Sequence, residues 1–280
     1  MMEDVDEFIA NLLNDLKRNR LTLPTLPQVA LRINNTIDDP ISTAKNIAKI
    51  ISTDAALTAR MIQTANSAFY RRDTRVEDVQ AAVTRLGVKV VRNIVTSLLI
   101  KQVFHTKYKI LKNHMENLWL HSTHVAAISF VLAKTFTSLK PEEAMLGGLI
   151  HDIGELPILA YAEKYPLIAN DEPTLNKIIE KIGPALGKTM LQTWKFSPQL
   201  VTVAAEREYL SRNSAEPVDY TDVVMIANLH CYIGAQHRLA KVNWSSIPAF
   251  NKLGLTPDQS IKTMHEAGEE ILEIKKLLSD

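Results

Sequence analysis

A histidine and an aspartate stand side by side in residues 147–154, at the end of an apolar segment. His151 and Asp152 would be costly to remove from water unless a partner neutralises them. A second histidine, His121, lies on an upstream helix, and imidazole nitrogens and carboxylate oxygens are ligands of divalent metal ions. These residues predict a metal site. The alternative is a purely structural pair, in which the histidine bonds a backbone carbonyl and the aspartate caps the next turn.

The composition excludes several classes of protein. Hydrophobic residues make up 46% and charged residues 22% of the 280 residues, which is ordinary for a soluble globular protein. A net charge of +1 implies no general attraction to nucleic acid or to anionic membranes. The single cysteine, Cys231, cannot form an internal disulfide, and the acidic start does not resemble a signal peptide. We therefore expect a cytoplasmic protein that does not associate with membranes.

Helical periodicity runs through the whole chain, and no segment shows the strict alternation of a strand. We predict an all-α protein, a multi-helical bundle with an N-terminal helical subdomain. The predicted helices are residues 3–18, 28–37, 44–51, 55–65, 77–86, 88–104, 117–136, 141–152, 174–182, 185–194, 198–210, 220–236 and 256–278. The predicted organisation is an N-terminal helix (1–20), an N-terminal helical part (21–110), a second helical part (111–240) and a C-terminal extension (241–280).

Other residues offer weaker chemistry. His124 shares a helix face with His121, but its apolar neighbours favour a packed core residue. Cys231 sits in the middle of a predicted helix, where nothing lowers the pKa of its thiol, so we interpret it as inert. The remaining histidines show no cluster spacing and are interpreted as surface or structural: His105, His114, His230, His237 and His265.

Basic residues outnumber acidic ones between residues 60 and 101, by eight to three. This excess could form a phosphate or nucleic-acid patch through Arg71, Arg72 and Arg75. Because the only aromatic residues nearby are Phe69 and Tyr70, we favour ordinary solvated helix faces and do not expect nucleic acid as a partner.

Several blocks of sequence, taken in order, resemble the HDOD domain, an all-helical bacterial module related to the HD-domain phosphohydrolases. The blocks are residues 23–27 (LPTLP), 50–58 (IISTDAALT), 65–70 (ANSAFY), 81–87 (AAVTRLG), 119–122 (WLHS) and 148–154 (GLIHDIG). One departure is Ala55, where the family usually has proline. The resemblance extends from about residue 21 to residue 236.

The resemblance also implies a set of metal ligands. HD proteins bind metal through an upstream histidine, the His-Asp pair and a distant aspartate, which map here to His121, His151, Asp152 and Asn228. An amide at the fourth position removes a charge and a strong oxygen ligand. Histidines common in relatives near Pro184 and in residues 199–209 are also missing, so a one-metal site is the most that is implied. The acids that could replace the lost carboxylate are Glu155, Glu206 and Asp222.

The resemblance implies two functions. We expect a regulatory signalling module with a degenerate metal site, which binds a signalling protein or a small ligand. Asn66 and Ser67 would tie neighbouring backbone together, and Arg71 and Arg72 would contribute to binding. The alternative is a metal-dependent phosphohydrolase of nucleotides or phosphodiesters, in which one divalent ion activates water and Asp152 is catalytic.

Overall fold

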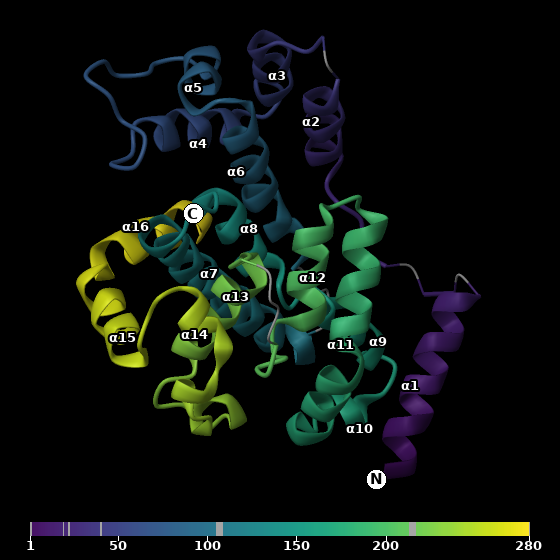
Figure 1. Ribbon diagram of the computed structural model, residues 1–280. Coiled ribbons are helices and arrows are strands. Elements are labelled where there is room, and N and C mark those ends of the chain that lie inside the picture. The colour runs from purple at the N-terminus through teal and green to yellow at the C-terminus, as the bar shows by residue number, and fades with distance from the viewer. Residues whose placement is uncertain are drawn as a thin grey trace. The chain divides into compact units, whose positions relative to one another are not determined.

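The computed structural model describes residues 2–18, 20–21, 23–39, 41–104, 109–212 and 217–279, and every regular element within these ranges is a helix (Figure 1). The prediction of an all-α protein is confirmed. None of the described helices combines the length and the apolar composition that crossing a bilayer requires. Residues 105–108, which include His105 and lie just before the predicted boundary at residue 110, are outside the described residues.

The chain divides into two compact units that interleave in sequence. Unit 1 comprises Met1–Thr25 and Val103–Ile271, and unit 2 comprises Leu26–Gln102 and Leu272–Asp280. The first helix, α1 (Met2–Lys17), therefore belongs to the same unit as the histidine-bearing helices.

Unit 1 is built around three buried helices, α7 (Lys109–Phe136), α8 (Pro141–Ile150) and α13 (Tyr220–Cys231), which pack on one another. Every residue of α13 from Tyr220 to His230 is buried. Around this core lie α9 (Glu155–Ala162), α10 (Pro166–Ala169), α11 (Glu172–Thr193), α12 (Pro198–Glu206), the 3-10 helices η2 (Arg238–Lys241) and η3 (Trp244–Ser246), α14 (Pro248–Lys252) and α15 (Pro257–Glu266).

Two glycines allow helices of unit 1 to approach closely. A Cβ added to Gly148 would lie 2.7 Å from the Ala126 Cα of α7, and one added to Gly154 would lie 2.0 Å from the Gly183 oxygen of α11. The first contact holds the end of α8 against α7. The second holds the start of α9 against α11. Together they fix the two chain segments that flank His151 and Asp152.

Helix α11 differs from the prediction. Residues 174–182 and 185–194 were expected to form two helices separated at Pro184, but α11 continues through the proline. Proline removes one helical hydrogen bond and usually ends or kinks a helix. Here the helix keeps a buried face on both sides of Pro184, with Ile182, Gly183, Leu186 and Gly187 all packed. Tertiary packing has overridden the local preference.

Unit 2 contains α2 (Gln28–Asp38), α3 (Ala44–Ile51), α4 (Ala55–Ala65), α5 (Val79–Leu86) and α6 (Val88–Ile100). The 3-10 helix η1 (Lys101–Val103) follows α6 and ends at the first residue of the next unit 1 segment. Side chains start the short helices by accepting backbone N–H bonds: Thr43 caps α3, Asp54 caps α4 and Asp78 caps α5. Gly87 ends α5 with a φ of +81°, a conformation that favours glycine.

The predicted C-terminal helix of residues 256–278 is two helices, α15 and α16 (Gly268–Ser279). Ala267 ends α15, and its backbone N–H donates to the carbonyl oxygens of His265 and Thr263. The second part of α16 belongs to unit 2, where Glu273 accepts a hydrogen bond from the Ala68 backbone at 3.3 Å.

Candidate metal centre

Three side chains predicted as metal ligands meet inside unit 1. His121 comes from the middle of α7, and His151 and Asp152 come from the turn that follows α8. His151 is completely buried and Asp152 is 5% exposed, whereas His121 reaches the edge of a cavity. The Nε2 atoms of the two histidines are 3.3 Å apart, and Asp152 Oδ2 lies 2.9 Å from His151 Nε2 and 3.5 Å from His121 Nε2.

The backbone sets the tautomer of His151. Its Nδ1 lies 2.7 Å from the carbonyl oxygen of Gly148, which can only accept, so the proton of the neutral ring is on Nδ1. The lone pair of Nε2 then points toward Asp152 and His121. A histidine fixed in this way by its second nitrogen is the arrangement found around metal ligands.

The three ligand atoms fit one divalent cation. Ligands about 2.1 Å from a metal are about 3.4 Å apart in a tetrahedron and about 3.0 Å apart in an octahedron. The observed separations of 2.9, 3.3 and 3.5 Å lie around these values. Two lone-pair acceptors 2.9 Å apart also repel unless a proton or a cation lies between them. Among the described residues, these three form the only group of histidine, cysteine and acidic side chains with metal-binding spacing.

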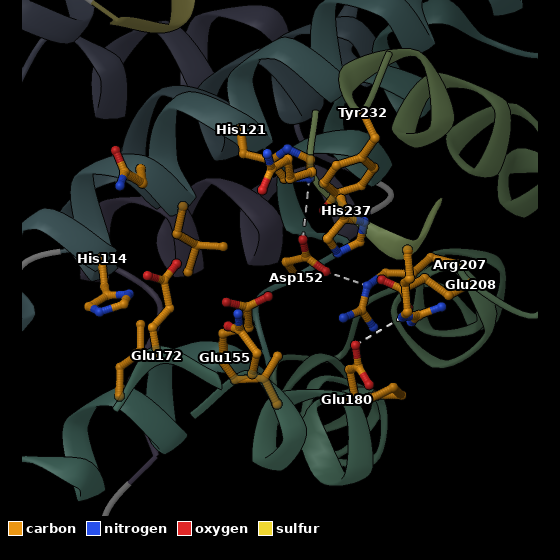
Figure 2. A pocket seen from close by; sticks show the side chains of 18 residues that line it. His114, His121, Asp152, Glu155, Glu172, Glu180, Arg207, Glu208, Tyr232 and His237 are labelled. Carbon is orange, nitrogen blue, oxygen red and sulfur yellow. Dashed lines mark hydrogen bonds and ion pairs between the residues drawn. The ribbon is translucent and has the colours of Figure 1, made fainter. Parts of the chain in front are cut away.

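A buried arginine, Arg207, pairs with the same aspartate. Arg207 lies immediately after α12 and is 5% exposed; its Nε forms an ion pair with Asp152 Oδ1, and its Nη1 donates to the Ala204 oxygen at 2.9 Å. Each carboxylate oxygen of Asp152 thus has its own neighbours. Oδ1 faces the guanidinium of Arg207 and Oδ2 faces the two histidines, of which Figure 2 draws His121.

These neighbours control the charges of the cluster. Burial alone would raise the pKa of Asp152, but the buried Arg207 cation holds it well below its ordinary range, so the carboxylate is ionised. For His121, burial and the neighbouring His151 lower the pKa to about 4, so its ring is neutral at pH 7. A neutral imidazole and an ionised carboxylate are the forms that bind a metal.

Asn228 occupies the position of the distant acid. It lies on α13, is 1% exposed, and its side chain lies beside His121, where it favours the protonated ring. The structure thus places the Asn228 amide beside His121, and its correspondence to the fourth ligand stays a prediction from the resemblance.

Of the three acids that could replace this carboxylate, the structure brings only Glu155 to the cluster. Glu155 begins α9 and lines the same cavity as Asp152, and burial together with the Asp152 charge raises its pKa well above the ordinary value. Glu206 and Asp222 are both engaged by Arg212, at 2.8 and 3.1 Å, in a separate ionic network that ties α12 to α13.

The cluster lies in the wall of a cavity of about 440 Å³ within unit 1 (Figure 2). The acidic side chains of the wall are Asp152, Glu155, Glu172, Glu180 and Glu208; its arginines are Arg207 and Arg238. Arg238 pairs with Glu180 at 2.9 Å and with Glu208. Carboxylates thus outnumber guanidinium groups in this wall by five to two.

Sequence reasoning missed several residues of this wall. His237 stacks on Tyr232 with ring centroids 3.8 Å apart, Tyr232 lies 5.3 Å from the His121 ring, and His114 lines the far side. Both histidines had been interpreted as surface or structural residues. Arg207 was also missed, because an arginine between two glutamates has the pattern of a solvated helix end. Only the fold buries it.

The predicted binding residues of unit 2 lie apart from this cluster in the chain and belong to the loop after α4. Asn66 ties that loop, since its Nδ2 donates to the Val76 oxygen at 2.7 Å and its Oδ1 accepts from the Val76 N–H at 2.9 Å. The Ser67 hydroxyl is enclosed and has no hydrogen-bond partner among the described residues. Arg71 and Arg72 are exposed.

Comparison with known proteins agrees with this architecture. A structure from Shewanella amazonensis SB2B, named "Putative metal-dependent phosphohydrolase", is 29% identical and superposes with a TM-score of 0.85, covering 99% of this chain and 100% of that one. An HDOD domain protein of unknown function from Geobacter sulfurreducens is 20% identical, with a TM-score of 0.70 and coverages of 96% and 97%, which shows the shared fold.

One curated relative is an uncharacterized protein of Treponema pallidum (strain Nichols), 24% identical over 217 residues. The match spans 74% of this chain but only 42% of that relative. The sequence also matches the HDOD domain family over residues 23–209, which is most of the chain and includes His121, His151, Asp152 and Arg207. The chain belongs to the HDOD domain family.

Proposed function

We propose that this chain is a regulatory HDOD module that acts by binding a signalling protein or a small ligand. In this proposal His121, His151 and Asp152, which we call the HD cluster, form a binding centre without efficient turnover. The observation that carries the proposal is the buried pair between Arg207 and Asp152. It places a permanent protein cation on the aspartate that an HD phosphohydrolase would use for its metal and its water. Asn228, in the place of the distant acid, removes a second catalytic carboxylate.

The charge of the cavity supports the same proposal. A phosphate ester brings negative charge, which a hydrolase stabilises with cations. Here the cavity wall holds five carboxylates and two arginines, and both arginines already pair with carboxylates of that wall. Even with one divalent ion bound, these groups offer a phosphate little free positive charge.

A second candidate is the metal-dependent phosphohydrolase, and one observation favours it. His121 Nε2, His151 Nε2 and Asp152 Oδ2 converge with the separations that one cation needs, and the Gly148 carbonyl prepares His151 as a ligand. A divalent ion there would lower the pKa of bound water. His121, His151 and Asp152 would hold the ion, Asp152 would also orient water, and Glu155 would be the remaining acid available to move a proton.

The test is elemental analysis of protein purified without chelator, combined with a turnover assay on nucleotides and phosphodiesters. The variants are His151→Ala, His121→Asn and, as a matched control, the exposed His265→Ala, with circular dichroism to verify folding. If the chain is a binding module, neither the wild type nor any variant should show metal-dependent turnover, whether or not metal is bound. The proposal would be overturned in favour of the hydrolase by near-stoichiometric metal together with turnover, if both are lost in the two ligand variants and retained in the control.

A further inference from the structure

We propose that unit 2 carries a binding surface for the phosphate backbone of nucleic acid, formed by Arg72, Arg75 and Arg85. These arginines line one surface groove together with Thr74 and Thr84, between the end of the α4–α5 loop and helix α5. This arginine groove is distinct from the HD cluster, which belongs to unit 1. The proposal departs from the sequence-based interpretation of these residues as ordinary solvated faces.

The groove is held in shape before any ligand arrives. The two hydrogen bonds between Asn66 and Val76 close the loop at its base. Arg85 reaches from α5 to the same loop, donating to the Thr74 oxygen and hydroxyl and to the Ala65 oxygen. Residues 66–76 are therefore tied at both ends, so Arg72 and Arg75 project from an anchored loop. Anchoring of this kind lowers the entropy lost on binding.

The positive charge of the groove is not neutralised from within. Arg85 is bonded to neutral carbonyl and hydroxyl oxygens, so it keeps its net charge. Arg72 and Arg75 are exposed, and neither forms an ion pair among the described residues. The one carboxylate that lines the groove, Asp78, caps α5 by accepting the Ala81 N–H at 2.8 Å. Three guanidinium groups thus face a single carboxylate that is already engaged.

The charge of the whole unit points the same way, although the chain as a whole is nearly neutral. Unit 2 contains 13 lysines and arginines against 8 acidic residues. Because the whole chain carries a net charge of only +1, the rest of the chain is net acidic. A net charge concentrated on one unit attracts polyanions to that unit.

Phosphate fits this surface better than an acidic protein does. Guanidinium groups bind phosphate oxygens through paired N–H donors. Protein partners usually also need a buried apolar anchor at the centre of the interface. The apolar lining residues here are only Val76, which is buried, and Ala81, and none of the large exposed hydrophobic residues lies in the groove. Because no aromatic side chain lines the groove to stack on bases, recognition would be of the backbone and independent of sequence.

The test is fluorescence anisotropy of the full chain with a labelled 20-nucleotide single-stranded RNA and a labelled DNA duplex, at several salt concentrations. The variant Arg72→Ala/Arg75→Ala is expected to weaken binding at least about tenfold at low salt. It should reduce the slope of log K against log salt by about two, one for each lost phosphate contact. The matched control, Lys45→Ala/Lys49→Ala, removes the same charge from exposed positions of α3 in the same unit and should change affinity less than about threefold.

Two results would overturn the proposal. One is the absence of salt-dependent binding to either nucleic acid by the wild-type chain. If a labelled poly-glutamate, used as an acidic peptide probe, binds while neither nucleic acid does, the groove is assigned to an acidic protein partner and the proposal is wrong. The other is an equal loss in the arginine variant and the lysine control, since that reflects general charge and not this groove. All four substituted positions are exposed, so thermal unfolding should verify that each variant retains its fold.

Discussion

Arg207 Nε and Asp152 Oδ1 form an ion pair that is buried on both sides, with each residue 5% exposed. The pair joins the end of α12 to the turn after α8, two segments more than fifty residues apart in sequence. It leaves Asp152 Oδ2 directed at His151 and His121. The same carboxylate therefore serves the stability of unit 1 through one oxygen and the candidate site through the other.

Replacing Arg207 with methionine should reduce the free energy of unfolding by about 3–5 kcal/mol, because the buried Asp152 carboxylate then has no cation to compensate its charge. Urea denaturation measures the change. The control is Arg238→Met, which removes an arginine that is largely exposed and pairs with Glu180 and Glu208. That variant should lose less than about 1 kcal/mol. Equal losses in the two variants would contradict a special role for the buried pair.

Stability should fall as the pH drops from about 6.5 to about 4. Burial lowers the pKa of both His121 and His230 to about 4, whereas an unfolded histidine titrates near 6.5. Between these values the unfolded chain binds more protons than the folded one, so acid favours unfolding. Each histidine contributes at most about 3 kcal/mol, fully present above pH 6.5.

Urea denaturation at pH 7.5, 5.5 and 4.5 tests this dependence. His230→Gln should flatten the curve between pH 6.5 and 4, whereas the exposed His265→Gln should leave its slope unchanged. Glu155 contributes with the opposite sign, because its raised pKa favours the fold at low pH, but it acts equally in both variants. A slope in His230→Gln as steep as in the wild type would refute the assignment.

Asn66→Ala should destabilise the chain by about 1–3 kcal/mol, since it leaves the N–H and the carbonyl of Val76 without their partner. The neighbouring Ser67→Ala should change stability by no more than about 0.5 kcal/mol, because the Ser67 hydroxyl bonds no group in the described part of the chain. Thermal or urea unfolding of both variants gives the comparison. Equal changes in the two variants would show that the hydrogen bonds between Asn66 and Val76 do not stabilise the fold.

Gly154→Ala should be among the most harmful small substitutions. The added methyl group would lie 2.0 Å from the Gly183 oxygen and 2.5 Å from the Gly187 nitrogen, so α9 and α11 must separate. We expect a loss of about 3 kcal/mol or more in the free energy of unfolding. Gly268→Ala meets no atom within 4 Å and should be neutral or stabilising by up to about 1 kcal/mol. A folded Gly154→Ala protein of wild-type stability would show that this contact can relax.

Local patterns were sufficient for much of the fold. Helices α3 and α4 begin and end at the predicted residues, because caps such as Thr43 and Asp54 act within a few residues of the backbone they bond. The side chains of His121, His151 and Asp152 also lie together as expected, and their role as metal ligands stays a prediction. The prediction failed at Pro184, where packing that no local pattern encodes keeps α11 continuous.

The sequence by itself determined that this protein is helical, that it resembles the HDOD domain, and that its fourth ligand position holds an amide. The tertiary structure decided the rest of the centre: it brought Arg207 to Asp152, selected Glu155 over Glu206 and Asp222, and placed His114 and His237 in the cavity wall. The physical reason is range. Helix caps and periodicity act between neighbours in the chain, whereas burial and charge pairing depend on which distant helices meet.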